Sequence, residues 1–267
     1  MLKPNELMLL LQETYYITAS PKSEVLGFVL DMSLSKPTKI QGLITCLVYV
    51  RDKHVVMAIR GTKNHAGSAS AQDWGYNFVL ANSTDMYKQT DRYKLAETCL
   101  KNLLKKYPMS QYKVDLIGHS QSGMIVHLLS ESYNVTNAIS VNPAYKNVTM
   151  NQNEYLIRSS SDVISALAIP KKMTSDLLYP NWSKRHIITI PAETSDLLEE
   201  HKTTILNRLD PNMQIGKGLQ PIKGKALRGY IINDELIGGS WGQSRYFNFV
   251  RVHMKKQICH GLVLLLI

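Results

Sequence analysis

Apolar runs of strand length alternate with segments of helical spacing over much of this chain. The clearest helical segment is 91–107, where apolar side chains recur every three to four positions and lysines occupy the opposite side. From residue 85 to 206 such segments alternate with strands, which predicts a mostly parallel sheet with helices on both faces, an α/β fold. The expected strands are 25–32, 43–50, 55–59, 114–117, 138–141, 155–157 and 186–190, and the expected helices are a short one near residue 7, 91–107, one from 124, and 194–206.

The last sixty residues break this alternation. Seven of the fifteen glycines fall between Gly216 and Gly242, so loops are expected there, with a hairpin around 230–236. We therefore divide the chain into an α/β domain of residues 1–206 and a basic, Gly-rich extension of residues 207–267. The pattern assigns no function to that extension.

Composition narrows the class of protein. With 44% hydrophobic and 19% charged residues, the chain is expected to fold and not to be disordered. Its three cysteines, Cys46, Cys99 and Cys259, are scattered and show no metal-ligand spacing. Neither a disulfide framework nor a metal site is expected, and a reducing compartment is favoured.

No segment reads as a targeting or membrane-spanning sequence. The apolar run at 7–11 is interrupted at once by Gln12 and Glu13, so a short amphipathic helix is expected in place of a signal peptide. No run reaches the roughly 20 apolar residues of a membrane span. These features predict a cytoplasmic protein.

Positive charge gathers near the C-terminus. Residues 202–256 hold ten Lys or Arg against three acids, about +7 of the net +10. This charge predicts peripheral contact with anionic membrane, while a solvated basic surface is the plainer alternative. Because no aromatic interleaving or nucleic-acid motif accompanies the charge, nucleic acid is not expected as a partner.

The segment Gly-His-Ser-Gln-Ser-Gly at 118–123 joins an apolar strand to a helix. A turn this tight needs small neighbours and forces its middle residue, Ser120, into a strained conformation that exposes the hydroxyl. This is the nucleophile elbow of serine hydrolases. The usual Gly-x-Ser-x-Gly pattern is altered, because Ser122 takes the place of the second glycine and Gly123 follows it. We expect Ser122 to tighten the turn slightly.

A serine nucleophile needs a base, and the base needs an orienting carboxylate. In the α/β-hydrolase order the carboxylate follows the serine, on a loop beyond a strand. Asp162 directly follows the strand at 155–157 and a run of small residues, so it is the leading candidate. Asp176 and Asp196 are alternatives, although Asp196 also fits a helix cap.

Four histidines follow Asp162 and could serve as the base. His201 lies in the loop-to-helix region after the last expected strand, which places it at the catalytic edge, so it leads. His186 fits an edge-strand residue, and His253 and His260 belong to the extension. His119 lies inside the elbow, where the turn directs it away from the role of base.

The negative oxygen formed during acyl transfer also needs hydrogen-bond donors. The backbone N–H of Gln121, at the start of a helix, supplies one. Thr62 follows the strand at 55–59 and lies where a second donor is expected.

Four pieces of the chain, taken together, resemble the fungal-type (class 3) lipase family of α/β-hydrolases. They are the strand and loop at 56–62 ending in Arg-Gly-Thr, Asp73-Trp74 with Asn77, the turn at 118–123, and Ser161-Asp162-Val163 before a Leu-x-x-Pro-like segment at 166–170. The likeness extends over about residues 10–206.

This resemblance implies an α/β-hydrolase fold and a role for each site residue. Ser120 is then the nucleophile, Asp162 the orienting acid and His201 the base, with oxyanion donors from Thr62 and Gln121. The likeness also implies that Asp73 and Trp74 support the oxyanion loop structurally, that His186 lies on a non-catalytic strand, and that no metal or organic cofactor is used.

Two differences from the secreted members of this lipase family guide the prediction of function. The secretory signal and disulfides are missing, and the segment after Asn77 is too short for a large lid. Intracellular lipase-like proteins, including versions encoded by large DNA viruses, are the better likeness. The sequence thus predicts a carboxylic-ester hydrolase, with lipid esters as the expected substrates. The alternative is a catalytically inactive lipase-like fold that binds lipid or protein, an idea motivated by Ser122 and the basic extension.

Overall fold

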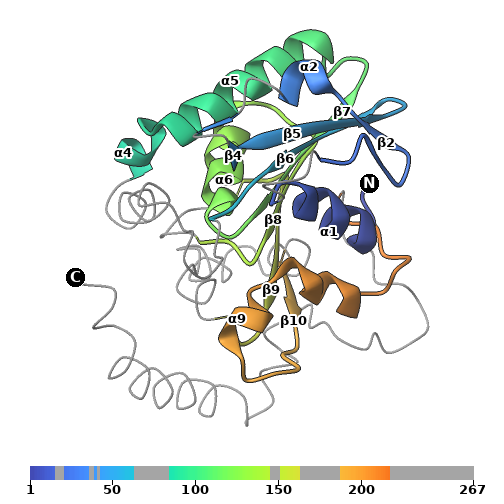
Figure 1. Ribbon diagram of the computed structural model, residues 1–267, viewed down its shortest axis with the longest axis vertical. Coiled ribbons are helices and arrows are strands. Elements are labelled where there is room, and N and C mark those ends of the chain that lie inside the picture. The colour runs from blue at the N-terminus through green and yellow to red at the C-terminus, as the bar shows by residue number, and fades with distance from the viewer. Residues whose placement is uncertain are drawn as a thin grey trace. The chain divides into compact units, whose positions relative to one another are not determined.

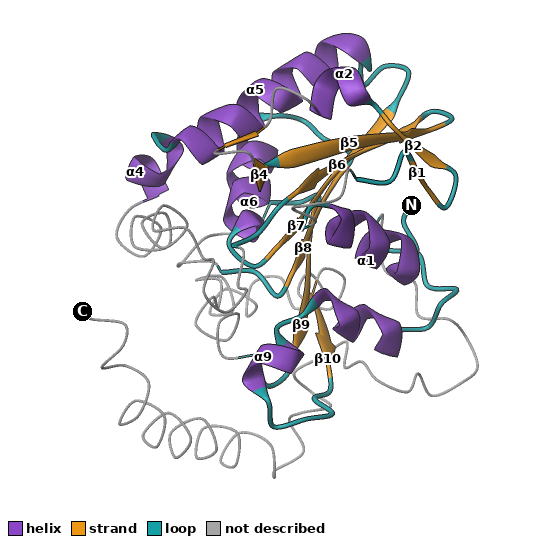
Figure 2. Ribbon diagram, viewed as in Figure 1, coloured by secondary structure: helices purple, strands orange, loops and turns teal. Residues whose placement is uncertain are grey.

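A computed structural model of the protein describes residues 1–15, 21–35, 39–40, 43–62, 84–144, 151–162 and 187–216. Within these residues, helices flank a mostly parallel eight-stranded sheet (Figures 1 and 2), as expected for an α/β fold. The strand order is β1-β2-β5-β6-β7-β8-β9-β10, and β3 and β4 form a separate pair.

The described strands and helices have the following bounds. The strands are β1 (Glu24–Val25), β2 (Phe28–Leu30), β3 (Lys39–Ile40), β4 (Leu43–Ile44), β5 (Cys46–Arg51), β6 (His54–Ile59), β7 (Lys113–His119), β8 (Asn137–Val141), β9 (Glu154–Ser159) and β10 (Ile187–Ile190). The helices are α1 (Pro4–Glu13), α2 (Met32–Ser35), α4 (Thr84–Lys88), α5 (Asp91–Lys106), α6 (Ser122–Ser132), α9 (Leu197–Glu200) and the 3-10 helix η3 (Thr203–Arg208).

Strand direction creates one functional edge. Strands β6 to β10 are parallel, each paired with the next, whereas β1, β2 and β5 join the sheet antiparallel. The carboxyl ends of β6 to β10 therefore meet along one edge. In open α/β sheets this edge is where ligands bind.

Both faces of the sheet are covered by apolar helix surface. On one face, Met57 and Leu116 pack in a single cluster with residues of α5 and α6. Their neighbours Val56 and Ile117 are equally buried but outside that cluster, because successive strand residues point to opposite faces. Helix α1 contacts β6, β7 and η3, and Figure 2 shows α1 and α6 on opposite sides of the strands. Burial on both faces explains the continuous apolar runs.

Two of the expected strands are interrupted. The run at 25–32 is a hairpin in which Leu26 (φ 50°) and Gly27 (φ 80°) form a two-residue turn between β1 and β2, and α2 follows. The run at 43–50 is divided at Thr45 into β4, which pairs with β3, and β5, which pairs with β2 and β6. At residues 26–27 local turn chemistry overrides apolar periodicity, and at Thr45 a change of pairing partner divides the run.

The compact domain continues beyond residue 206, where we expected it to end. Leu209 and Met213 are buried, and η3 packs on α1. The Ile215 N–H donates to the Leu2 carbonyl at 2.8 Å and forms an isolated β-bridge there. Residues 207–216 thus belong to the described domain, whereas the rest of the expected extension, from residue 217, lies outside the described residues.

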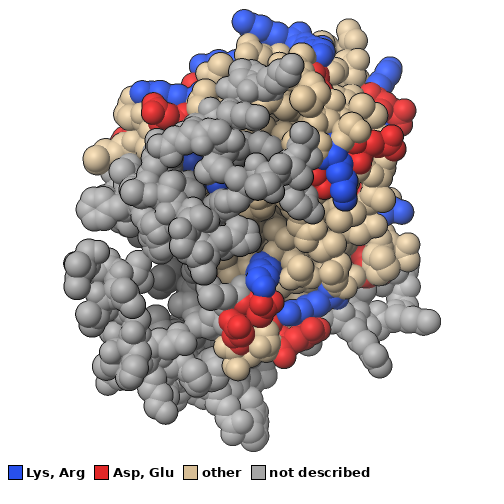
Figure 3. All heavy atoms as spheres, viewed as in Figure 1, with Lys and Arg blue, Asp and Glu red and all other residues tan. Residues whose placement is uncertain are grey.

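Both basic and acidic side chains occur on the described part of the face seen in Figure 3. Of the ten basic residues at 202–256, Lys202 and Arg208 are described, and both pair with acids: Lys202 with Glu199, and Arg208 with Glu193 and Glu200. The other eight lie outside the described residues, so contact with anionic membrane stays a prediction. Among the helices that the structure describes, none is long and apolar enough to cross a membrane.

Candidate active site

Ser120 lies in a strained turn between β7 and α6. Its φ is 59°, in the left-handed region that residues with a Cβ rarely adopt. The backbone holds this conformation from both sides, because the Ser120 N–H donates to Val141 and its carbonyl accepts from Gly123 and Ala144, each at 3.0 Å. The strain expected for the middle residue of the turn is confirmed. Strain of this kind gathers at functional sites.

Two glycines allow the backbones around Ser120 to approach each other. A Cβ on Gly118 would lie 2.8 Å from Val126 Cγ2 and 2.9 Å from Ser122. A Cβ on Gly61 would lie 2.3 Å from both the His119 carbonyl oxygen and the Tyr15 hydroxyl. Any side chain at Gly61 would therefore push the end of β6 away from the turn.

Ser122 contributes hydrogen bonds within the turn. Its Oγ accepts from the His119 N–H at 2.7 Å and lies within donating distance of the carbonyl oxygens of Ile59 (2.8 Å) and His119 (2.9 Å). The side chain is fully buried. The residue that departs from the Gly-x-Ser-x-Gly pattern thus ties the turn to the end of β6, a link that a glycine lacks.

The structure brings together Ser120, His201 and Asp162. His201 Nε2 lies 2.9 Å from Ser120 Oγ, and His201 Nδ1 lies 2.9 Å from Asp162 Oδ2. A carboxylate only accepts, so Nδ1 carries the proton toward Asp162, which leaves Nε2 to accept from the Ser120 hydroxyl. Asp162 is 1% exposed and His201 8% exposed. Ser120 follows β7, Asp162 follows β9, and His201 follows β10 and α9.

His201 lies at a break in the helix expected over 194–206. Helix α9 ends directly before it, Lys202 is extended (φ −73°, ψ 157°), and η3 begins one residue later. The carbonyls here bond to side chains: Asn142 Nδ2 donates to the carbonyl preceding His201 at 2.8 Å, and His119 Nε2 contacts the His201 carbonyl oxygen at 2.6 Å. The extended backbone at Lys202 ends the helix, and at this break the imidazole of His201 lies against Ser120.

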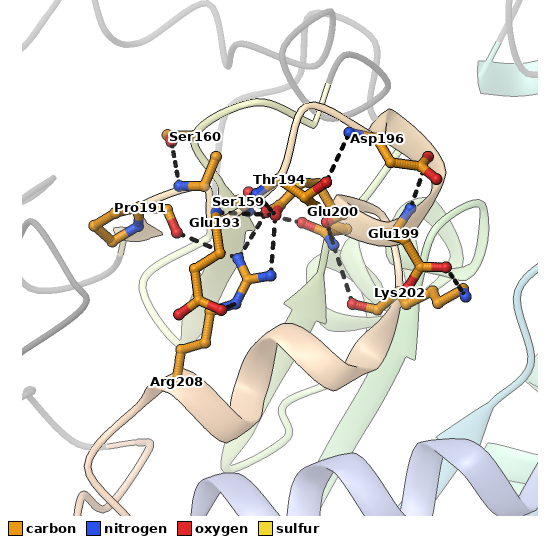
Figure 4. A network of polar contacts seen from close by, with 12 residues as sticks. Ser159, Ser160, Pro191, Glu193, Thr194, Asp196, Glu199, Glu200, Lys202 and Arg208 are labelled. Carbon is orange, nitrogen blue, oxygen red and sulfur yellow. Dashed lines mark hydrogen bonds and ion pairs between the residues drawn. The ribbon is translucent and has the colours of Figure 1, made fainter.

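Glu200, next to His201, is the centre of a buried network (Figure 4). Arg208 binds its carboxylate through two nitrogens, at 2.7 and 2.9 Å. The Ser159 hydroxyl and the N–H groups of Glu193 and Thr194 also donate to it. Burial acts to raise the pKa of Glu200, but these donors, Arg208 foremost, lower it to about 2. The network anchors the backbone that carries His201.

His119 is buried between Tyr15 and the backbone of His201. Burial first, and the neighbouring His201 second, lower the pKa of His119 to about 3. The neutral ring donates from Nε2 to the His201 carbonyl, so Nδ1 accepts from the Tyr15 hydroxyl at 2.6 Å. The Tyr15 oxygen in turn accepts from the Gly61 N–H at 3.1 Å. Both ring nitrogens are therefore engaged, one by Tyr15 and the other by the backbone of His201.

The two expected oxyanion donors lie at adjacent strand ends. Thr62 follows β6, and Gln121 is the N-cap of α6, so its N–H lies at the positive end of a helix dipole. Arg92 on α5 connects these segments: its guanidinium donates to Gln121 Oε1 at 2.5 Å and to the Arg60 carbonyl. Sequence reasoning missed Arg92, because an arginine among lysines on a helix resembles a solvent-facing residue. It also missed Tyr15, which no motif marks.

The remaining sequence candidates fall into two groups. Asp196 caps α9, since its Oδ1 accepts from the Glu199 N–H at 3.3 Å, as its alternative interpretation predicted. The others lie outside the described residues: Asp73, Trp74, Asn77, Asp176, His186, His253 and His260.

In the described part of the chain, no group of three or more His, Cys, Asp or Glu side chains could hold a metal ion. Cys46 and Cys99 are both buried and are not joined in a disulfide. No protein-family model matches this sequence, and no curated protein matches it.

Proposed function

We propose that this chain is a serine hydrolase with an α/β-hydrolase fold, similar to the fungal-type (class 3) lipases, and that it cleaves carboxylic esters. The observation that carries the proposal is the hydrogen-bonded chain from Asp162 through His201 to Ser120, with both distances at 2.9 Å. The position of each residue beyond a parallel strand supports the α/β-hydrolase assignment, since that fold presents its triad on such loops.

Acylation begins when Ser120 Oγ attacks the ester carbonyl carbon. His201 Nε2 takes the hydroxyl proton, and the resulting imidazolium is stabilised by Asp162. The carbonyl oxygen becomes negative and accepts hydrogen bonds at Thr62 and Gln121; one such donor is worth roughly 2.7–4 kcal/mol in the transition state. The carbon–oxygen ester bond then breaks, and the leaving alcohol takes the proton from His201.

Deacylation repeats these steps with water as the nucleophile. His201 takes a proton from the water, whose oxygen attacks the acyl carbon attached to Ser120. The bond to Ser120 Oγ breaks and Ser120 regains its proton from His201, which releases the carboxylic acid. This cycle uses no metal or organic cofactor.

Lipid esters are the proposed substrate class. The resemblance to lipases supports this choice, and the basic residues at 202–256 would hold the protein at an anionic lipid surface. Sedimentation of the 267-residue chain with vesicles tests whether the basic residues bind anionic lipid: we expect binding to vesicles that contain phosphatidylserine and no binding to neutral vesicles. Equal binding to both would contradict a role for the charge.

Hydrolysis of a short-chain nitrophenyl ester by the purified protein tests the activity. Ser120→Ala is expected to lower kcat by about 10³-fold or more, since the nucleophile is lost. The matched control is Ser132→Ala, at the exposed end of α6, which should retain wild-type activity. Activity that survives Ser120→Ala would overturn the assignment.

A fluorophosphonate probe separates this proposal from the inactive lipase-like alternative. The probe phosphonylates an activated serine, so wild-type protein should be labelled at Ser120 and Ser120→Ala should not. Absence of both labelling and hydrolysis in folded wild-type protein would favour the binding module.

A further inference from the structure

Arg92 is among the most deeply buried side chains of the domain, at 1% exposure. It is the second residue of α5, two positions after the N-cap residue Thr90. Burial of a guanidinium is unfavourable unless its N–H groups are hydrogen-bonded, so a buried arginine calls for specific acceptors.

Two of its acceptors belong to the two segments that form the proposed oxyanion site. Arg92 Nη1 donates to Gln121 Oε1 at 2.5 Å, and Nη2 donates to the backbone carbonyl of Arg60. Gln121 carries one proposed oxyanion N–H, and Arg60 lies two residues before Thr62, the other proposed donor. One planar group therefore spans from the start of α6 to the end of β6.

The segment before Thr62 is held at consecutive backbone atoms. The Arg60 N–H donates to the Thr45 carbonyl at 2.9 Å, and the Gly61 N–H donates to the Tyr15 hydroxyl at 3.1 Å. Arg92 binds the carbonyl between these two N–H groups. The loop that leads to Thr62 is thus bound by Arg92 on α5, by Tyr15 two residues after the end of α1, and by Thr45 directly before β5.

Geometry and charge both favour a guanidinium at this position. Its fork is rigid, so binding two oxygens at once fixes the distance between them, which a flexible lysine ammonium does less well. A buried positive charge beside the two donor segments also stabilises the negative charge that develops on the substrate oxygen. This effect is strong in a site that excludes water.

We propose that Arg92 is a positioning residue for the oxyanion site, which it assembles by holding Gln121 and the Arg60 carbonyl in fixed relation. This inference rests on the proposed serine hydrolase function. Arg92 acts through the two donor segments and on the transition state, with little effect on binding of the ester in its ground state.

The test compares Arg92→Lys and Gln121→Met with wild-type protein in nitrophenyl ester hydrolysis. Arg92→Lys keeps the charge and loses the fork, whereas Gln121→Met keeps the backbone N–H and removes the side-chain acceptor. Each is expected to lower kcat by about 10²-fold, the effect of small misplacements in a site, while KM changes by less than about threefold. The double variant should lose little more than Arg92→Lys alone, because Gln121→Met removes a contact that Arg92→Lys already breaks.

Affinity for an alkylboronic acid supplies a second readout. Its tetrahedral adduct with Ser120 places an oxygen where the oxyanion forms, so its Kd should rise in proportion to the fall in kcat across the variants. A general loss of structure would not produce this proportionality. The control is Arg51→Lys, at an arginine on β5 that binds Glu6 away from Ser120, which should retain kcat and boronate affinity.

If Arg92→Lys does not fold, Gln121→Met still tests the inference, because it breaks the same contact and leaves Arg92 unchanged. If wild-type protein hydrolyses the ester and reacts with fluorophosphonate, but the folded variants keep its kcat and boronate affinity, the inference is wrong and the proposed function stands. A raised KM with unchanged kcat would assign Arg92 to ground-state binding and also overturn it. Wild-type protein that neither hydrolyses ester nor reacts with the probe overturns both proposals.

Discussion

His119 Nε2 lies 2.6 Å from the backbone carbonyl oxygen of His201, so the residue before the proposed nucleophile holds the residue proposed to activate it. The other ring nitrogen binds Tyr15, which also accepts the N–H of Gly61. Three segments that are distant in sequence thus meet at one imidazole. The position of His201 depends on this ring from one side and on the Glu200 network from the other.

The pH dependence of stability should reveal the buried ring. In the folded protein the pKa of His119 is about 3, against an ordinary value of 6.5, so the unfolded chain takes up a proton first as the pH falls. Stability is therefore full above pH 6.5 and declines from there toward pH 3, at up to about 1.4 kcal/mol per pH unit. Urea unfolding at pH 7 and pH 5 should show a smaller decline for His119→Gln than for wild type. Equal declines would contradict the assignment.

Glu200→Gln should destabilise the domain and slow the reaction. The partly buried Arg208 would keep Glu193 but lose the charge of Glu200, its fully buried partner, so the cost should approach the lower end of the roughly 3–5 kcal/mol typical of breaking a buried pair. Because His201 follows directly, kcat should fall as well. Thermal unfolding and ester hydrolysis measure the two effects. The matched control is Glu199→Gln, which breaks the exposed pair with Lys202 and should cost less than about 1 kcal/mol.

The same carboxylate predicts a second pH effect, in a more acidic range. The folded pKa of Glu200 is about 2, below its ordinary value of 4.5. Its contribution is therefore present above pH 4.5 and is lost as the pH falls toward 2, because the unfolded chain again binds the proton first. The difference in free energy of unfolding between wild type and Glu200→Gln should be smaller at pH 3 than at pH 5. A constant difference would count against the network.

Ser122→Gly, which restores the usual glycine pattern, should lower stability. It removes the hydroxyl that binds the His119 N–H and faces the Ile59 carbonyl, and buried groups left without partners cost about 1–3 kcal/mol. Urea unfolding measures the loss. The control is Ser130→Ala, whose hydroxyl donates to the His127 carbonyl within the same helix, away from the turn. A Ser122→Gly protein more stable than wild type would show that Ser122 strains the turn.

Gly61→Ala should abolish most activity. The new methyl would overlap the His119 carbonyl and the Tyr15 hydroxyl, and overpacking of this kind typically costs about 1–3 kcal/mol while displacing the loop that carries Thr62. Gly27→Ala is the matched control. It strains a positive-φ turn (φ 80°) away from the site, so it should reduce stability and leave kcat unchanged. Normal kcat in Gly61→Ala would exclude a role for this loop.

The parallel sheet and the side chains at its carboxyl edge followed from the sequence. Apolar runs of strand length ended at Ser120 and shortly before Asp162, and parallel strands place their ends together. Chain order left four histidines as candidates, and the place of His201 after the last expected strand made it the leading one. Local signals failed at His201, where the helix expected over 194–206 breaks. Lys202 is extended there, and two side chains distant in sequence, Asn142 and His119, bind the carbonyls of Glu200 and His201.

What only the tertiary structure decided is the set of residues that hold the site in place. Tyr15, Arg92 and Arg208 carry no motif, and periodicity places each on an ordinary helix or loop. The contacts of Tyr15 and Arg92 join residues far apart in the chain: Tyr15 is 104 residues from His119, and Arg92 is 32 residues from Arg60. Arg208 binds Glu200, eight residues earlier, across the break at His201. Apolar pattern and turn chemistry are local properties, so they determine which elements form. A buried hydrogen bond is formed only when those elements pack, so its partners become visible only in the folded chain.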